Sequence, residues 1–345
     1  MEAAVVDTGS KLLKAGPAIP DQAPSLIIPT QMRRLPEDGS LNESSLSEEI
    51  TVDPVVRGFI RDWDAREDLL HHVLYTGLGW EIGNEGQILF TDPLSTRRFL
   101  SNDIMTFCFN VQSVREQLVQ LMFETFNISR FYASEQAVLS LYAVGRISGC
   151  TVDIGHGKID IAPVIEGAVH HITSRRFEIG GIDLTKLLAQ ELGKSNPLVN
   201  ISMSDVEKIK ERYSCCAEDE LAYGKLECPT EKYTLPDGQV HVITIGREIY
   251  TVGEALFQPS ILGLEAHGIV EQLVRVYQQY HLIIIGSYLR TQYYVPPEYM
   301  PENLSMYSAW VGGAILAKVV FPQNQLVTKA DYDENGPSVV HRKCF

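Results

Sequence analysis

Two short stretches of this chain combine an aspartate with glycines in a way that suits phosphate binding. At 149–163, GCTVDIGHGKIDIAP, apolar residues alternate on both sides of a turn that holds Asp153, Gly155 and Gly157. This pattern predicts two antiparallel strands joined by a tight hairpin. Glycines let the backbone approach a ligand closely and direct N–H groups at an anion. A carboxylate at the strand end could hold a divalent cation through water.

The same pattern occurs at the start of the chain. Residues 4–16, AVVDTGSKLLKAG, run from a β-branched strand through Asp7 and Gly9 into a second strand. A single Asp-x-Gly is an ordinary hairpin turn and by itself favours a structural interpretation. Two copies far apart in one chain predict two related lobes that grip one phosphate chain from opposite sides.

Length, charge and cysteine usage narrow the class of protein. The 345 residues are enough for two domain-sized lobes, and 45% hydrophobic with 21% charged residues is typical of globular chains. A net charge of −15 speaks against direct nucleic-acid binding and favours a basic protein partner. The six cysteines form no C-x-x-C pair, which is typical of a reducing compartment. Without a signal sequence or a membrane-length apolar run, we expect a soluble intracellular protein.

Helix and strand patterns alternate in blocks, with one hairpin at the head of each half, so the predicted class is α/β. We expect a mobile Ser/Glu-rich loop at 31–53, since it has few apolar groups to bury. Asp62 or Asp64 could cap the first helix. The expected strands are 26–29, 87–91 and 240–245; the expected helices are 57–80, 114–126, 134–143, one after Gly180-Gly181, 204–220, 253–257, 270–276 and 307–320; and a polar tail is expected at 336–345.

A resemblance to the actin family runs over nearly the whole chain. It is carried by QLMFETFN at 120–127, QAVLSLYA at 136–143, LPDGQV at 235–240, EALFQPSILG at 254–263 and YDENGPSVVHRKCF at 332–345. Within the family the chain is similar to the divergent nuclear actin-related proteins of plants. The resemblance implies an actin-like fold, in which duplicated RNase-H-like domains form two lobes around a cleft for ATP with magnesium or calcium.

The resemblance also implies four subdomains. They are 1–29 with 54–145 and 306–345 as the base of the first lobe, 30–53 as a small mobile subdomain-two loop, 146–179 with 263–305 as the base of the second lobe, and 180–262 as its outer subdomain.

Two stretches match nothing in the family. One is the insertion around Ser95–Ser113. The other lies between Val276 and Pro296, where the family has a strand, a Gly-Gly-Thr turn over the adenosine and a helix. His281–Gly286 could mimic the strand, but the double glycine is absent. We expect a deleted nucleotide-side segment, from an alternative transcript or a gene-model artefact, and hence weakened or lost ATP binding.

Site residues follow from the resemblance position by position. It implies phosphate loops at Asp7, Thr8, Gly9 and Ser10 with Lys14, and at Asp153, Gly155, His156 and Gly157; Lys210 and Glu211 beside the adenosine; Gln136 orienting the attacking water; and Asp7 and Asp153 holding the metal through water.

Three positions depart from the family pattern. Lys11 replaces a glycine of the first loop, His156 a metal-side aspartate, and Asp160 a histidine that positions the lytic water. Losing these last two groups should slow in-line hydrolysis, so we expect residual ATPase activity at most.

The resemblance further implies an apolar groove that accepts a partner helix. Its lining would be Tyr142, Gly145, Ile147, Leu316, Val319 and Val320, for which core packing is the alternative. The implied partners are a helix of a chromatin-remodelling ATPase and other actin-related proteins, with no nucleic acid, membrane or homopolymer contact.

The resulting hypothesis is a structural or regulatory subunit in the nucleus, with the cytoplasm as a second location, that influences gene expression and development. The alternatives are an ATP-binding, slowly hydrolysing actin-like cytoskeletal protein and a sugar-kinase or Hsp70-type relative.

Overall fold

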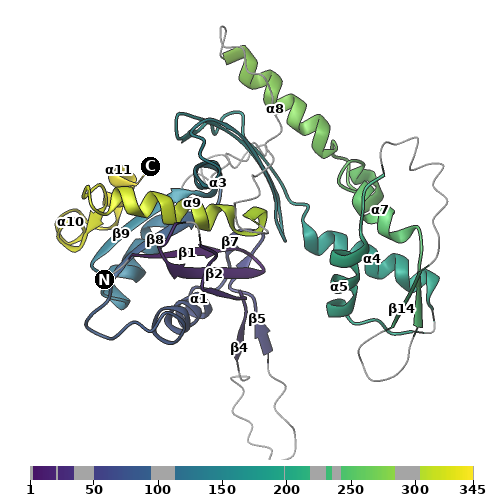
Figure 1. Ribbon diagram of the computed structural model, residues 1–345, viewed down its shortest axis with the longest axis horizontal. Helices are drawn as coiled ribbons and strands as arrows, with labels where there is room; N and C mark the ends of the chain where they lie inside the picture. Colours follow the sequence, from purple (N-terminus) through teal and green to yellow (C-terminus); the bar gives the residue numbers. More distant parts are fainter. Residues whose placement is uncertain are drawn as a thin grey trace, which may run out of the picture. The chain divides into compact units, whose positions relative to one another are not determined.

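The computed structural model describes residues 3–20, 22–34, 50–94, 113–197, 199–217, 231–234, 242–283 and 304–344 (Figure 1). The chain divides into two compact units, one formed by Met1–Phe177 with Gly286–Phe345 and the other by Glu178–Ile285. Both units combine helices with β-strands, which confirms the predicted α/β class. The boundaries of the four expected subdomains stay a prediction.

A six-stranded mixed sheet forms the centre of the first unit. Strand β1 pairs antiparallel with β2 and parallel with β8, which in turn pairs parallel with β9. The first four residues of β1 are all buried, as expected for an inner strand covered on both faces. In spatial order the strands are β16 (Val327–Thr328), β9 (Arg130–Glu135), β8 (Gln87–Asp92), β1 (Ala4–Thr8), β2 (Leu12–Pro17) and β3 (Leu26–Pro29).

Helix α9 (Leu304–Val320) packs against α3 (Gln136–Ala143) and runs along the strands β1 and β8 (Figure 1). Gly312 makes this approach possible, because a Cβ atom there would overlap the carbonyl oxygen of Leu139 on α3. Beside it, the buried Trp310 donates its indole N–H to the Val5 carbonyl oxygen at 3.0 Å. Helix α9 is therefore fitted closely to both α3 and the sheet.

The other helices of the first unit complete this core. Helix α1 begins where the Asp62 carboxylate accepts a hydrogen bond from the Ala65 N–H at 2.8 Å, which confirms the predicted cap. These helices are α1 (Trp63–His71) with the π-helical turn η1 (His72–Gly77), helical residues 113–120 with the π-helical turn η2 (Leu121–Thr125), α10 (Lys329–Asn335), the 3₁₀ turn η4 (Pro337–Val339) and α11 (Val340–Lys343).

A second, four-stranded sheet of the first unit contains the hairpin predicted at 149–163. Strand β10 (Gly149–Ile154) pairs antiparallel with β11 (Ile159–Ile165), which also pairs with β12 (Ala168–Val169) and β13 (Arg175–Phe177). Two short ladders accompany the sheets, β4 (Met32–Arg34) with β5 (Ile50–Val52), and β6 (Val55–Val56) with β7 (Phe59–Ile60).

The second unit has its own apolar core, to which leucines of α4 and the strand residues Ile243 and Ile245 belong. Asn196, just after α4, holds the Thr244 backbone on both sides, accepting from its N–H at 2.8 Å and donating to its carbonyl oxygen at 3.0 Å. The elements are α4 (Gly181–Ser195), α5 (Met203–Tyr213), β14 (Glu231–Thr234), β15 (Val242–Ile245), α7 (Glu248–Glu254), the 3₁₀ turn η3 (Pro259–Leu262) and α8 (Ile269–Ile283).

Several sequence-based expectations were wrong in detail. The helix expected from Ser134 begins at Gln136, because Ser134 and Glu135 still pair with β8 at the end of β9. The ends of the expected 31–53 loop form the β4–β5 ladder, and residues 35–49 lie outside the described residues. The expected polar tail contains α11, with Val339, Val340 and Cys344 buried in the core.

The two stretches expected to depart from the family are described only in part. His281–Ile283 continue α8, so the strand expected from His281 does not begin there. Residues 284–303, most of the expected insertion (95–112) and the LPDG turn at 235–238 lie outside the described residues. Within the described ranges, no helix is long and apolar enough to span a membrane.

The α3–α9 contact predicts a large effect of one added methyl group. Gly312→Ala should destabilise the protein by about 1–3 kcal/mol, because the new Cβ forces α9 away from Leu139. Gly193→Ala, in α4, is the matched control, since nothing lies within 4 Å of a Cβ there and alanine favours a helix. Thermal unfolding should show a loss for the first variant and none for the second; equal stability of the two would contradict the packing argument.

Candidate functional site

The two hairpins are built alike, as predicted. In the first, the Gly9 N–H donates to the Leu12 carbonyl oxygen at 3.0 Å; in the second, the Gly155 N–H donates to that of Lys158 at 2.9 Å. The strands also match in register, with Asp7 opposite Lys14 and Asp153 opposite Asp160. Because Gly9 and Gly155 use their N–H groups to close the turns, they do not direct them at an anion as expected.

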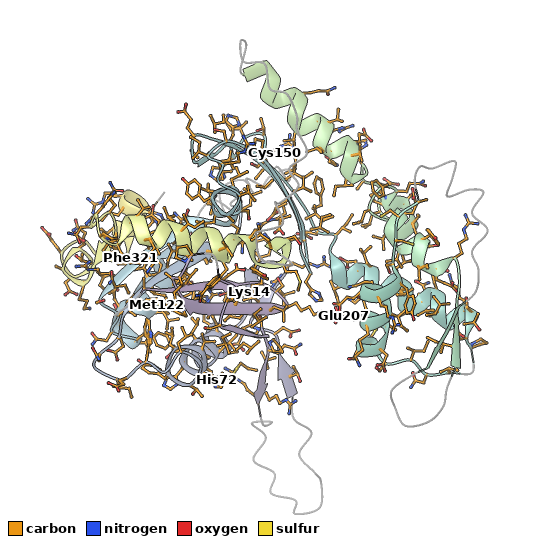
Figure 2. The ribbon with its side chains drawn as sticks, in the orientation of Figure 1. Lys14, His72, Met122, Cys150, Glu207 and Phe321 are labelled. Atoms are coloured by element: carbon orange, nitrogen blue, oxygen red, sulfur yellow. The ribbon has the colours of Figure 1, made fainter. Side chains whose placement is uncertain are left out.

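Asp7 is the most enclosed acidic group of the site, with 3% of its surface exposed. Lys14, which projects from β2 (Figure 2), donates to its Oδ2 at 2.8 Å. Gln136 donates to Oδ1 at 2.8 Å, and the Thr91 hydroxyl donates to the same oxygen. Burial by itself would raise the pKa of Asp7, but the Lys14 charge and the three donors outweigh it and lower the pKa.

Gln136 lies at the start of α3, and its side-chain amide spans Asp7 and Thr91, 3.4 Å from the Thr91 hydroxyl. It therefore joins α3 to β1 and β8 in this structure. Its predicted role toward an attacking water stays a prediction. Sequence analysis missed Thr91, although a polar residue near the end of the apolar strand QILFTD, parallel to the Asp7 strand, is the signal that could have identified it.

The second hairpin carries a different set of charges. The Lys158 ammonium donates to Asp160, and Arg176 of β13 holds both oxygens of Asp160 at 2.8 and 3.0 Å. Burial lowers the pKa of Lys158, and the neighbouring Asp160 opposes this shift. Asp160, placed by the resemblance beside a lytic water, is here the acid of a buried ion-pair network. Sequence analysis assigned no role to Lys158 or Arg176.

Asp153 lies on β10, the strand that also carries Cys150 in Figure 2. Although much of the Asp153 surface is exposed, partial loss of solvation around its carboxyl raises its pKa, while Lys158 lowers it and Asp160 and then Asp7 raise it further. The acids of the two hairpins are therefore near enough to influence each other's charge. That the hairpins face a common ligand stays a prediction.

The turn between β6 and β7 contacts both hairpin loops. Arg57 and Gly58 have φ angles of 52° and 80°, the pattern of a type I′ turn. The Gly58 N–H donates to the Ser10 hydroxyl at 2.8 Å, and the Arg57 guanidinium donates to the Gly157 carbonyl oxygen at 2.9 Å. A Cβ on Gly157 would lie 2.9 Å from the Arg57 Cα atom. The missing side chain of Gly157 therefore leaves room for Arg57 in the β6–β7 turn.

Thr8 and His156 are the remaining residues that were predicted for the two phosphate loops. The Thr8 hydroxyl is buried and, within the part of the chain that the structure describes, has no hydrogen-bond partner. Such a group would be satisfied by a bound ligand. His156 is half-buried at the tip of the second loop.

Lys210 and Glu211 lie in the second unit, on α5. The Lys210 ammonium donates to the Gly181 carbonyl oxygen at 3.0 Å and to the Thr185 hydroxyl at 2.7 Å. These bonds tie α5 to the first turn of α4. Glu211 is exposed. The proposed contacts of both residues with a nucleoside stay predictions.

The residues predicted to line a partner groove belong to α3, α9 and the segment after α3. Ile147 and Val319 are 61% and 48% exposed, whereas Tyr142 and Leu316 are half-buried against the main core. Gly145 is exposed, and its φ of 69° lets the chain turn at the end of α3. Val320 is buried at 3% exposure and belongs to the core, so its assignment to a groove was wrong.

The donor set fits a phosphate chain better than a metal ion. Lys14 and the buried Thr8 hydroxyl could bind phosphate oxygens, and bound nucleotide would supply the phosphate groups for transfer. Both carboxylate oxygens of Asp7 already accept from protein donors. Among the described residues, no three His, Cys, Asp or Glu side chains are grouped so that they could hold a metal. The residues present therefore do not fit a metal centre held by protein ligands.

Comparison with known proteins identifies the relatives of this chain. The sequence model of the family described as actin matches residues 1–211 and 296–345. This match spans Ser95–Ser113, so it bears on the expected departure from the family only for the second stretch, between Val276 and Pro296. The chain is 64% identical to Actin-related protein 7 of Arabidopsis thaliana and 59% identical to Actin-related protein 7 of Oryza sativa subsp. japonica, over the full length of each chain. It is 32% identical to Actin-like protein 9 of Bos taurus, over 99% of this chain and 88% of that relative.

The buried Asp7–Lys14 pair predicts a characteristic response to substitution. Lys14→Met should cost about 3–5 kcal/mol of unfolding free energy, because it leaves a buried carboxylate without its cation. Adding Asp7→Asn should recover much of that loss. Urea denaturation of both variants provides the test, and a double variant no more stable than the single one would contradict the pairing.

The lowered pKa of Asp7 also predicts a pH dependence. The stabilisation should be fully present above the ordinary carboxyl pKa of about 4 and be lost as the pH falls through the lower pKa of the folded state. Asp7→Asn should remove this part of the acid-induced loss in urea titrations between neutral and acid pH. An unchanged pH profile would contradict the assignment.

Proposed function

Because the chain belongs to the actin family, we propose that it is a non-filament actin-related protein, a structural or regulatory subunit of a nuclear chromatin-remodelling complex. Its partners would be a helix of the remodelling ATPase and other actin-related proteins. Through that complex it would influence gene expression and development. The nucleus is the proposed location, with the cytoplasm as a second one.

Exposed apolar side chains around α3 and α9 are the observation that carries this proposal. Ile147 and Val319 are large, apolar and about half or more exposed, and Leu316 is half-buried beside Val319 on α9. Tyr142 packs near the β11–β12 turn, since a Cβ on Gly167 would lie 2.6 Å from its hydroxyl oxygen. An amphipathic partner helix would cover such side chains with its own apolar face.

The charge of the chain supports the choice of partner. A net charge of −15 at neutral pH repels nucleic acid and attracts basic segments. We therefore propose that contact with chromatin is indirect, through a basic helix of a protein partner. Direct binding to nucleic acid, membrane or further copies in a filament is not part of this function.

We further propose that ATP is bound weakly and hydrolysed slowly at most. The amide of Gln136 is engaged by Asp7, and Asp160 by Lys158 and Arg176, so neither is poised over a water. The family model leaves residues 212–295 unmatched, and the alignment with the Arabidopsis relative spans 379 positions against 345 residues here. Both observations support a missing nucleotide-side segment.

The alternative is an ATP-binding, slowly hydrolysing cytoskeletal protein, favoured by the preserved construction of the two hairpins. Sedimentation in polymerising salt separates the two functions. We expect the purified chain to stay in the supernatant under conditions that pellet a filament actin run in parallel. A pellet of this chain that depends on salt and ATP would favour the cytoskeletal function.

The proposed docking surface predicts a selective effect of one charge. Val319→Asp should reduce capture of remodelling-complex subunits from nuclear extract by the tagged chain about tenfold or more, because a buried unpaired charge weakens an apolar contact. Ile82→Asp is the matched control, because Ile82 is 85% exposed in a loop after η1.

Mass spectrometry of the captured proteins gives the readout for both variants. We expect remodelling subunits with the unmodified chain and with Ile82→Asp, and few with Val319→Asp. Capture without any remodelling subunit would contradict the proposed function. Equal capture by all three would contradict the docking surface.

A further inference from the structure

Lys158 is a buried cation at the second hairpin that the functions above do not use. Only 7% of the residue is exposed, and its Cδ and Cε atoms pack against Gly58, where an added Cβ would lie 2.9 Å from Cε. The ammonium donates to Asp160. An ammonium has three N–H donors, and among the described residues Asp160 is the acceptor that it reaches.

The network around Lys158 holds this ammonium in one place. Arg176 grips both oxygens of Asp160 and donates to the Leu94 carbonyl oxygen at 2.6 Å. Its guanidinium also lies 5.6 Å from the ring centroid of Phe59. Asp160 is thus fixed from one side by an anchored arginine, and Lys158 is positioned by Asp160 from the other. A group held in this way is preorganised.

The two hairpins differ in the position of their lysine relative to the paired aspartates. In the first, Asp7 has a lysine, Lys14, directly opposite on the next strand. In the second, the residue opposite Asp153 is another acid, Asp160, and the cation that bonds Asp160 is Lys158, two positions earlier in the chain. Each hairpin therefore contains one lysine that is bonded to an aspartate, Lys14 to Asp7 and Lys158 to Asp160.

The charges at the second hairpin leave little attraction for a metal ion. Asp160 forms ion pairs with two cations, Lys158 and Arg176, so this network carries an excess positive charge that opposes the charge of Asp153. Mg²⁺ and Ca²⁺ bind to sites with excess carboxylate charge and open oxygen ligands. An ammonium near Asp153 repels a dication from the carboxylate that the resemblance assigns to it.

We propose that Lys158 takes the place of the divalent cation, and that Lys14 and Lys158 bind the phosphate chain of a nucleoside triphosphate from the two hairpins. Nucleotide binding by this chain is then largely independent of divalent cations. The inference rests on the nucleotide-binding part of the proposed function. It differs from a purely structural salt bridge, which would stabilise the fold and leave nucleotide affinity unchanged.

Calorimetric titration of the full chain with ATP, in magnesium and in EDTA, tests the inference. We expect removal of magnesium to change the affinity less than about threefold. Lys158→Met keeps the aliphatic stem and removes the charge, so it should weaken ATP binding in EDTA by about tenfold or more. Lys158→Arg, which retains the charge, should remain close to the unmodified chain in EDTA. Inorganic triphosphate in place of ATP should give the same order of variants.

A second neutral variant guards against a folding defect. If Lys158→Met does not unfold cooperatively, Lys158→Gln, which can still donate to Asp160, takes its place in the same titrations. A loss of ATP affinity of tenfold or more for the unmodified chain in EDTA would overturn the inference. Equal affinity of the neutral variant and the unmodified chain in EDTA would also overturn it.

Absence of ATP binding under both conditions would overturn this inference together with the nucleotide part of the proposed function. Capture of remodelling subunits is measured without added nucleotide. Failure of that experiment would concern the partner function alone.

Discussion

A carboxylate removed from water must be paired, and Asp7 is the group on which this requirement acts most strongly in the first unit. Its three partners come from β2, β8 and α3, so the charge can be satisfied only when these elements have assembled around β1. The same bonds bring the end of β8 and the start of α3 to the first hairpin loop. The stability of the first unit and the geometry of the site therefore both depend on the Asp7 carboxylate.

The second hairpin solves the same problem with other residues. Asp160 is compensated by Lys158 and Arg176, and the turn at Arg57–Gly58 contacts the loops of both hairpins. The close approach of Arg57 to Gly157 explains why a side chain is not accepted in that loop. The outcome is a pair of loops joined by protein contacts, in which Lys14 is bonded to Asp7 and Lys158 to Asp160. Such a site suits holding a phosphate chain more than hydrolysing it.

The helices behind the site connect it to the proposed partner surface. Gln136 begins α3 at Asp7, and α3 packs tightly on α9 through Gly312. On α9, Val319 is exposed and Leu316 is half-buried. The same two helices therefore support both the proposed nucleotide loops and the proposed docking side chains. This arrangement fits a subunit whose main task is to join other proteins.

Much of this protein was determined by local sequence. The alternation around two Asp-x-Gly turns predicted both hairpins, because turn chemistry and a period of two act over neighbouring residues. The cap at Asp62 is local for the same reason. Only the tertiary structure decided the partners of the buried charges. Sequence analysis assigned no role to Lys158 or Arg176, because Arg176 reaches Asp160 only when β11 and β13 pair. Likewise, Val320 lies in the core and the expected polar tail contains a helix. Both outcomes depend on packing between segments far apart in the chain. A pattern of neighbouring residues does not show which distant residues will bury a given charge or side chain.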